Sequence, residues 1–130
     1  MTRSGQPKAI LVIDDDDPVR ASTALLLEAS GYRVIEATNG VEALAHLAAA
    51  EAEDIGLIVF DLQMPKMSGW TFREHQLADS ATADIPTVVL TGSPLGRDDL
   101  KRLRIRAALS KPFMFEELLR FVRAHVEPAR

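Results

Sequence analysis

Aspartates follow two apolar runs of this 130-residue chain, and their placement would suit a divalent cation. Residues 9–13 lead into the acidic stretch 14–17, and residues 55–60 lead into Asp61. If the two runs lie side by side in the fold, their terminal carboxylates meet. Carboxylates about 4 Å apart repel by roughly 4 kcal/mol per pair at an effective dielectric near 20. Proton uptake or a hard cation such as Mg²⁺ relieves that repulsion.

Two later apolar runs also end in polar groups. Residues 85–90 are followed by Thr91 and Gly92, and residues 107–110 are followed by Lys111. These positions supply a hydroxyl, a bare backbone amide and an ammonium group. If all four runs are parallel strands of one sheet, these groups share its carboxyl edge with the aspartates.

The elements that must position these groups follow from the hydrophobic pattern. Continuous apolar runs indicate strands that are buried on both faces of a parallel sheet. Here they alternate with helical patterns, which is typical of an α/β fold. Strands are predicted near residues 8–13, 32–37, 55–60, 86–90 and 107–110. Helices are predicted near residues 17–30, 40–52, 69–79, 96–105 and 115–126.

This order of elements predicts a doubly wound sheet. Five βα units with right-handed crossovers favour the flavodoxin-like strand order 2-1-3-4-5. Ligands of such sheets bind where the winding direction reverses, here between the first and third strands. Asp14, Asp15 and Asp61 would converge there, whereas Asp16 and Asp17 are interpreted as helix caps.

The composition is that of an ordinary globular protein, with 47% hydrophobic and 26% charged residues. The length favours one domain, residues 8–127, between tails at residues 1–7 and 128–130. The net charge of −4 gives no basic footprint for nucleic acid. The absence of cysteine excludes disulfides, thiol catalysis and thiolate metal sites. No apolar stretch suits a membrane span or a secretory signal, so we expect a cytoplasmic protein without a membrane partner.

Taken in order, these motifs resemble the receiver domain of two-component response regulators. The resemblance covers Lys8 to about Val126, with matching residues at four strand ends: Asp14-Asp15 with Val19-Arg20, Asp61-Leu62-Gln63-Met64-Pro65 with Gly69, Thr91-Gly92, and Lys111-Pro112-Phe113. One such motif would be weak evidence, but four in sequence are specific. The resemblance implies a stand-alone receiver similar to chemotaxis regulators. It would take phosphate from a sensor histidine kinase or a histidine phosphotransfer protein.

The resemblance implies a role for the residues at the strand ends. Asp61 would be the phosphoacceptor, because a carboxylate can attack a phosphoryl donor. Thr91 and Lys111 would bind the phosphoryl oxygens. By analogy, the Lys111-Pro112 peptide bond is expected to be cis. On this interpretation the protein is a signalling phosphoprotein and not an enzyme, since it catalyses only its own phosphorylation and hydrolysis.

The resemblance also implies a metal site. Asp15, Asp61 and the backbone carbonyl of Gln63 would bind Mg²⁺ or Mn²⁺ directly, and Asp14 would act through a water molecule. The ion would neutralise charge on the transferring group.

Three features depart from the family. Ala108 stands where receivers usually carry an aromatic residue, three positions before the lysine. Arg104-Ile105 replace the usual Gly-Ala pair, and the stretch from Thr91 to Lys111 is short. We therefore expect phosphorylation to be reported through other elements, or to be relayed without a large switch.

Two other functions compete with this one. A receiver-like interaction module would keep the fold without using phosphate; Ala108 slightly favours it and the complete acid set argues against it. A haloacid-dehalogenase-type phosphatase would use Asp14-Asp15-Asp16, but that class needs a later acidic pair in the site.

The partner on the output side is not named by the sequence. Only residues 127–130 follow the last predicted helix, so we expect output through contacts with an unknown protein target. A basic segment near the fourth predicted helix is either a solvated face or a docking surface for an acidic partner; it comprises Arg97, Lys101, Arg102, Arg104 and Arg106.

Overall fold

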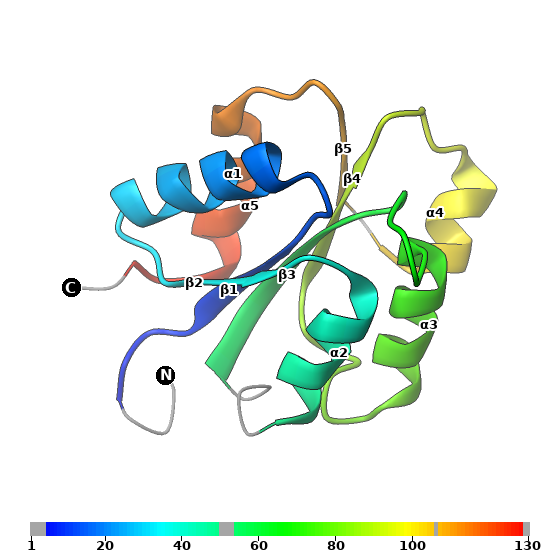
Figure 1. Ribbon diagram of the computed structural model, residues 1–130, viewed down its shortest axis with the longest axis horizontal. Coiled ribbons are helices and arrows are strands. Elements are labelled where there is room, and N and C mark those ends of the chain that lie inside the picture. Colours follow the sequence, from blue (N-terminus) through cyan, green and yellow to red (C-terminus); the bar gives the residue numbers. More distant parts are fainter. Residues whose placement is uncertain (1–4, 50–53, 106, 129–130) are drawn as a thin grey trace.

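The computed structural model describes residues 5–49, 54–105 and 107–128. Within them, five strands alternate with five helices (Figure 1). The strands are β1 (Ala9–Ile13), β2 (Val34–Ala37), β3 (Ile55–Asp61), β4 (Thr87–Thr91) and β5 (Ala107–Ser110). The helices are α1 (Asp17–Ala29), α2 (Gly40–Ala48), α3 (Gly69–Ala78), α4 (Arg97–Leu103) and α5 (Phe115–His125). Parts of the predicted tails, the predicted helix end at residues 50–52, and Arg106 lie outside the described residues.

The strands form one parallel sheet in the order β2-β1-β3-β4-β5, which confirms the predicted order. Every residue of the central strands β1 and β3 is buried, as expected of apolar runs without alternation. Ile13 pairs in register with Phe60. The residues that follow them, Asp14 and Asp61, therefore leave the sheet side by side.

Two apolar cores cover the two faces of the sheet. Helices α1 and α5 lie on one face, and α2, α3 and α4 lie on the other (Figure 1). The first core joins Leu27 of α1 to Leu118 of α5, and the second joins Phe72 of α3 to Leu103 of α4. Of the described helices, none combines the length and apolar character that crossing a bilayer requires.

Polar side chains cap α1 and α2 where these helices begin at the carboxyl edge of the sheet. Asp16 accepts the N–H of Val19 at 3.1 Å at the start of α1, and Asn39 accepts the N–H of Glu42 at 2.8 Å at the start of α2. Each of these bonds satisfies a backbone donor that the helix cannot pair itself. Asp17, also interpreted as a cap, is instead the first residue of α1.

Helix α4 is shorter than the predicted span 96–105. It ends at Leu103 because Arg104 adopts a left-handed conformation with φ of 54°. Such a helix-ending position usually holds Gly or Asn, which tolerate positive φ. Nothing in the sequence therefore marks this end of the helix.

Candidate functional site

Three carboxylates meet at the carboxyl edge of the sheet. Asp14 and Asp15 follow β1, and Asp61 is the last residue of β3. Each side chain offers one oxygen, and these oxygens all lie within 4.8 Å of one another. Asp14 is 1% exposed and Asp61 is 7% exposed, while Asp15 is open to solvent. The structure thus brings together the three aspartates that the sequence analysis singled out.

Backbone amides orient the two buried carboxylates. Oδ1 of Asp14 accepts the N–H of Asp16 at 3.0 Å, and Oδ1 of Asp61 accepts the N–H of Gln63 at 2.9 Å. Arg20 strengthens the first of these turns, because its Nη1 donates to the carbonyl of Asp14 at 2.8 Å. The second oxygen of each carboxylate is left for another partner.

Lys111, one residue after β5, bonds to both of these second oxygens. Its Nζ lies 2.7 Å from Oδ2 of Asp61 and 3.2 Å from Oδ2 of Asp14. Burial opposes the charged form of Lys111, but the two carboxylates outweigh it, so its pKa is raised. The Lys111-Pro112 peptide bond is cis, as expected.

Burial also raises the pKa of Asp14, because a carboxylate loses solvation inside the protein. The N–H of Asp16 and the charge of Lys111 offset that effect only in part, and the charge of Asp61 adds to it. The cluster is therefore under electrostatic strain, which a further cation would relieve.

Thr91 occupies its expected place at the end of β4, but its hydroxyl is engaged elsewhere. The residue is 5% exposed. Its Oγ1 donates to the carbonyl of Ser93 at 2.6 Å and accepts the N–H of Ser93 at 3.1 Å. The backbone carbonyl of Thr91 accepts the N–H of Lys111 at 2.8 Å, but within the described residues the hydroxyl bonds to neither Asp61 nor Lys111. The hydroxyl must leave the Ser93 carbonyl before it can contact a group attached to Asp61.

The donor set fits a hard divalent cation. All three side chains of the cluster are carboxylates, which are the ligands that Mg²⁺ and Mn²⁺ favour. One ammonium group cannot balance three carboxylates, so the site stays net negative beside Lys111. The exposed position of Asp15 leaves a route for an ion that keeps several waters.

Ala108 lies in β5, three residues before Lys111. Its methyl group packs against the second core, the one under α2, α3 and α4. No aromatic side chain stands at this position to link β5 with the end of β4.

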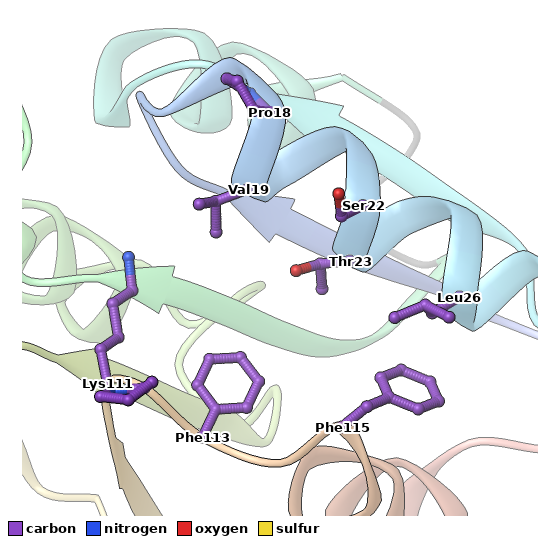
Figure 2. A pocket seen from close by; sticks show the side chains of 9 residues that line it. Pro18, Val19, Ser22, Thr23, Leu26, Lys111, Phe113 and Phe115 are labelled. Atoms are coloured by element: carbon purple, nitrogen blue, oxygen red, sulfur yellow. The ribbon is translucent and has the colours of Figure 1, made fainter.

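An apolar cleft of about 580 Å³ opens beside Lys111. The sequence did not predict this cleft. Figure 2 shows Val19 and Leu26 of α1 facing Phe113 and Phe115 across it. Leu26 is 46% exposed, so the cleft is accessible from solvent. The sequence signal that could have indicated this cleft is the pair Phe113 and Phe115, which lie at the start of the last predicted helix. Because Lys111 lines the cleft and also bonds to Asp61, the cleft adjoins the carboxylate cluster.

Comparison with known proteins gives a consistent result. The family model described as the response regulator receiver domain matches residues 10–123. The DNA-binding dual master transcriptional regulator RpaA of Synechocystis is 38% identical over 117 residues. That alignment covers 88% of this chain but only 47% of RpaA, so the chain spans about half the length of this relative.

Solved structures share the architecture. The chemotaxis protein CheY4 of Vibrio cholerae has a TM-score of 0.81 at 28% identity, with 90% of this chain and 97% of that chain covered. The response regulator TrrA of Thermotoga maritima, solved in complex with Mg²⁺ and BeF, has a TM-score of 0.77 at 29% identity and the same coverage. The sheet order and the helix placement described above are those of a known structural family.

Proposed function

The chain belongs to the family of response regulator receiver domains, and we propose that it accepts a phosphoryl group at Asp61. The observation that supports this proposal best is the position of Asp61, whose Oδ2 lies 2.7 Å from the ammonium of Lys111 within a cluster of carboxylates. Receiver domains accept phosphoryl groups from histidine kinases, so we propose a sensor histidine kinase or a histidine phosphotransfer protein as the donor. We propose that this exchange takes place in the cytoplasm.

In the proposed step, one oxygen of Asp61 forms a bond to phosphorus while the phosphorus–nitrogen bond of the donor breaks. The electron pair of that bond stays on the imidazole nitrogen. Lys111 would hold one phosphoryl oxygen, and Thr91 would hold another after its hydroxyl leaves Ser93. A divalent cation held by the carboxylate cluster and the carbonyl of Gln63 would neutralise charge on the transferring group.

Acetyl phosphate tests the phosphoacceptor directly. We expect the wild-type chain to gain the mass of one phosphoryl group in the presence of Mg²⁺, and Asp61→Asn to gain none. Asp84→Asn is the matched control, because Asp84 is an exposed carboxylate that precedes β4 at the opposite edge of the sheet. A wild-type chain that stays unlabelled, or an Asp61→Asn chain that is labelled normally, would contradict the assignment.

We propose further that the donor protein docks over the apolar cleft beside Lys111. A donor must bring its phosphohistidine into contact with Asp61, so it must also cover the surface around that residue. The cleft between α1 and Phe115 supplies apolar area next to the site, and burial of such area stabilises a complex by roughly 25 cal/mol per Å². Small donors such as acetyl phosphate need no such surface.

Variants of two neighbouring leucines of α1 test donor docking independently of the phosphoryl-transfer chemistry. Leu26 lines the cleft, whereas Leu25 is 68% exposed and does not line it. We expect Leu26→Asp to slow transfer from the phosphorylated donor by about tenfold or more, with labelling by acetyl phosphate unchanged. Leu25→Asp is the control. Equal transfer rates for the two variants would place the donor on another surface.

A further inference from the structure

A buried arginine on α3 holds the end of α4. Arg73 is 5% exposed, and its guanidinium donates to acceptors from three elements. Nε donates to the carbonyl of Leu103 at 2.8 Å, and Nη2 donates to the carbonyl of Arg104 at 2.9 Å. Nη1 donates to Oε1 of Gln76 at 2.7 Å and to Oγ1 of Thr87 at 3.0 Å. One side chain thereby connects α3, the last turn of α4 and the first residue of β4.

The charge of Arg73 is balanced by a helix end. Within the described residues, no carboxylate forms an ion pair with it. Burial lowers its pKa, and the nearby charge of Arg104 lowers it further. The carbonyls at the carboxyl end of α4 carry the negative end of the helix dipole, which favours a cation there. If α4 moved away, a buried charge would lose two of its acceptors, and that is strongly unfavourable.

Further buried polar groups hold the Arg73 side chain in place. Gln76 is fully buried, and its Nε2 donates to the carbonyls of Thr82 at 3.1 Å and Ile85 at 3.3 Å. The hydroxyl of Thr82 in turn donates to the carbonyl of Gln76 at 2.7 Å. Arg73 therefore has little freedom to follow a shift of α4.

At the other end of α4, Leu95 is half-buried against the second core, but among the described residues no side-chain hydrogen bond joins residues 96–100 to α3. The exposed Gly96 precedes the helix, and its N–H donates to Asp99 of the first turn at 3.1 Å. Gly92, Ser93 and Pro94, which lead to it from β4, are exposed. Among the described residues, the side-chain bonds and ring contacts between α3 and α4 all lie at residues 102–104.

We propose that Arg73 fixes the carboxyl end of α4, so that phosphorylation displaces only residues 92–97. This inference rests on the proposed phosphorylation of Asp61. The displacement would enter through Thr91 and Ser93, since the Thr91 hydroxyl must release the Ser93 carbonyl to reach the phosphoryl group. Ala108 leaves β5 without an aromatic side chain that could carry the change further. The surface that reports the signal is then the loop before α4 together with Arg97, the first residue of that helix.

Amide spectra with beryllofluoride and Mg²⁺ test the displacement on the wild-type chain. We expect amide shift changes at residues 92, 93 and 95–97 to exceed those at residues 101–105 by about fivefold. Comparable changes over the whole of α4 would overturn the proposal. Spectra unchanged at Asp61 and Thr91 as well would contradict the proposed function, and with it the displacement.

Hydrogen exchange without the mimic tests the anchor independently of phosphorylation. The amides of Arg104 and Ile105 bond to the carbonyls of Lys101 and Leu100 in the last turn of α4. We expect Arg73→Met to speed their exchange by about tenfold relative to wild type. Exchange rates equal to wild type would show that Arg73 does not fix the carboxyl end of α4 and would overturn the proposal.

Two further variants control this measurement. Arg120→Met makes the same change at an exposed position on α5 and should leave the exchange of both amides unchanged. Arg73→Lys keeps the charge without the planar fork, so it should give an intermediate rate even if Arg73→Met does not fold. A wild-type rate in a folded Arg73→Lys would overturn the proposal.

Discussion

Asp14 combines deep burial with a charge that a cation would bind. Its carboxylate is 1% exposed, and burial raises its pKa above the ordinary value of 3.8. Lys111 is close enough to balance it, but the shorter bond of Lys111 is to Asp61. Without a metal ion, the ionised Asp14 therefore weakens the native state at neutral pH.

We expect Asp14→Asn to stabilise the protein at neutral pH without divalent cations, by about 1 kcal/mol. Because the pKa of Asp14 is raised in the native state, its penalty grows as pH rises from 3.8 through the native pKa. Below pH 3.8 both folded and unfolded chains are protonated there, so the advantage of Asn should vanish. Urea unfolding across this pH range measures the difference in stability between the variant and wild type, with Asp84→Asn as control. A variant less stable than wild type at neutral pH would contradict the expectation.

Lys111 has the opposite effect, since its ammonium is the described partner of two buried carboxylates. We expect Lys111→Met to lower the free energy of unfolding by about 1–3 kcal/mol without Mg²⁺, and added Mg²⁺ to restore more stability than in wild type. The raised pKa means that the contribution of Lys111 is complete below its ordinary pKa of 10.5 and is lost at more alkaline pH. Denaturant unfolding measures both effects. The exposed Lys101→Met should show neither.

At the scale of elements, the loop between β3 and α3 places Asp61 by close contact. A Cβ on Gly69 would lie 2.6 Å from Cα of Leu62 and 2.8 Å from the carbonyl oxygen of Asp61. The amide of Gly69 also donates to the carbonyl of Leu62 at 2.9 Å. The start of α3 can thus approach the site only without a side chain at this position.

We expect Gly69→Ala to destabilise the fold by about 2 kcal/mol or more, because backbone atoms would have to move. The same shift would displace Asp61, so Mg²⁺ should bind more weakly. Gly92→Ala is the matched control, since a Cβ there meets nothing within 4 Å. Denaturant unfolding with and without Mg²⁺ compares the two. Equal stability of both variants would show that the loop has room that the structure does not indicate.

The elements also show what the sequence could predict. Strands β1 and β3 are apolar on both faces, so their burial and their terminal aspartates could be read directly. The end of α4 could not, because Arg104 lacks the residue type that normally marks it. The roles of Arg73 and of the Thr91 hydroxyl were equally hidden, since they depend on carbonyl groups placed by tertiary packing.

At the scale of the whole molecule, the acidic site is coupled to the stability of the sheet. Asp14 follows β1, Asp61 is the last residue of β3, and Lys111 follows the edge strand β5. The two carboxylates and the ammonium group lie close together only when all three strands are in place. A cation that binds the cluster therefore binds the folded chain and not the unfolded one.

We expect Mg²⁺ to raise the Tm as a direct consequence. At about ten times its Kd the ion would add about 1.4 kcal/mol, which is about 5 °C for a domain of this size. Asp15→Asn should reduce the shift, because it removes the exposed carboxylate of the cluster. An equal ionic strength of NaCl controls for screening of surface charges. Thermal unfolding that responds to NaCl and Mg²⁺ alike would show that the carboxylates do not form a specific cation site.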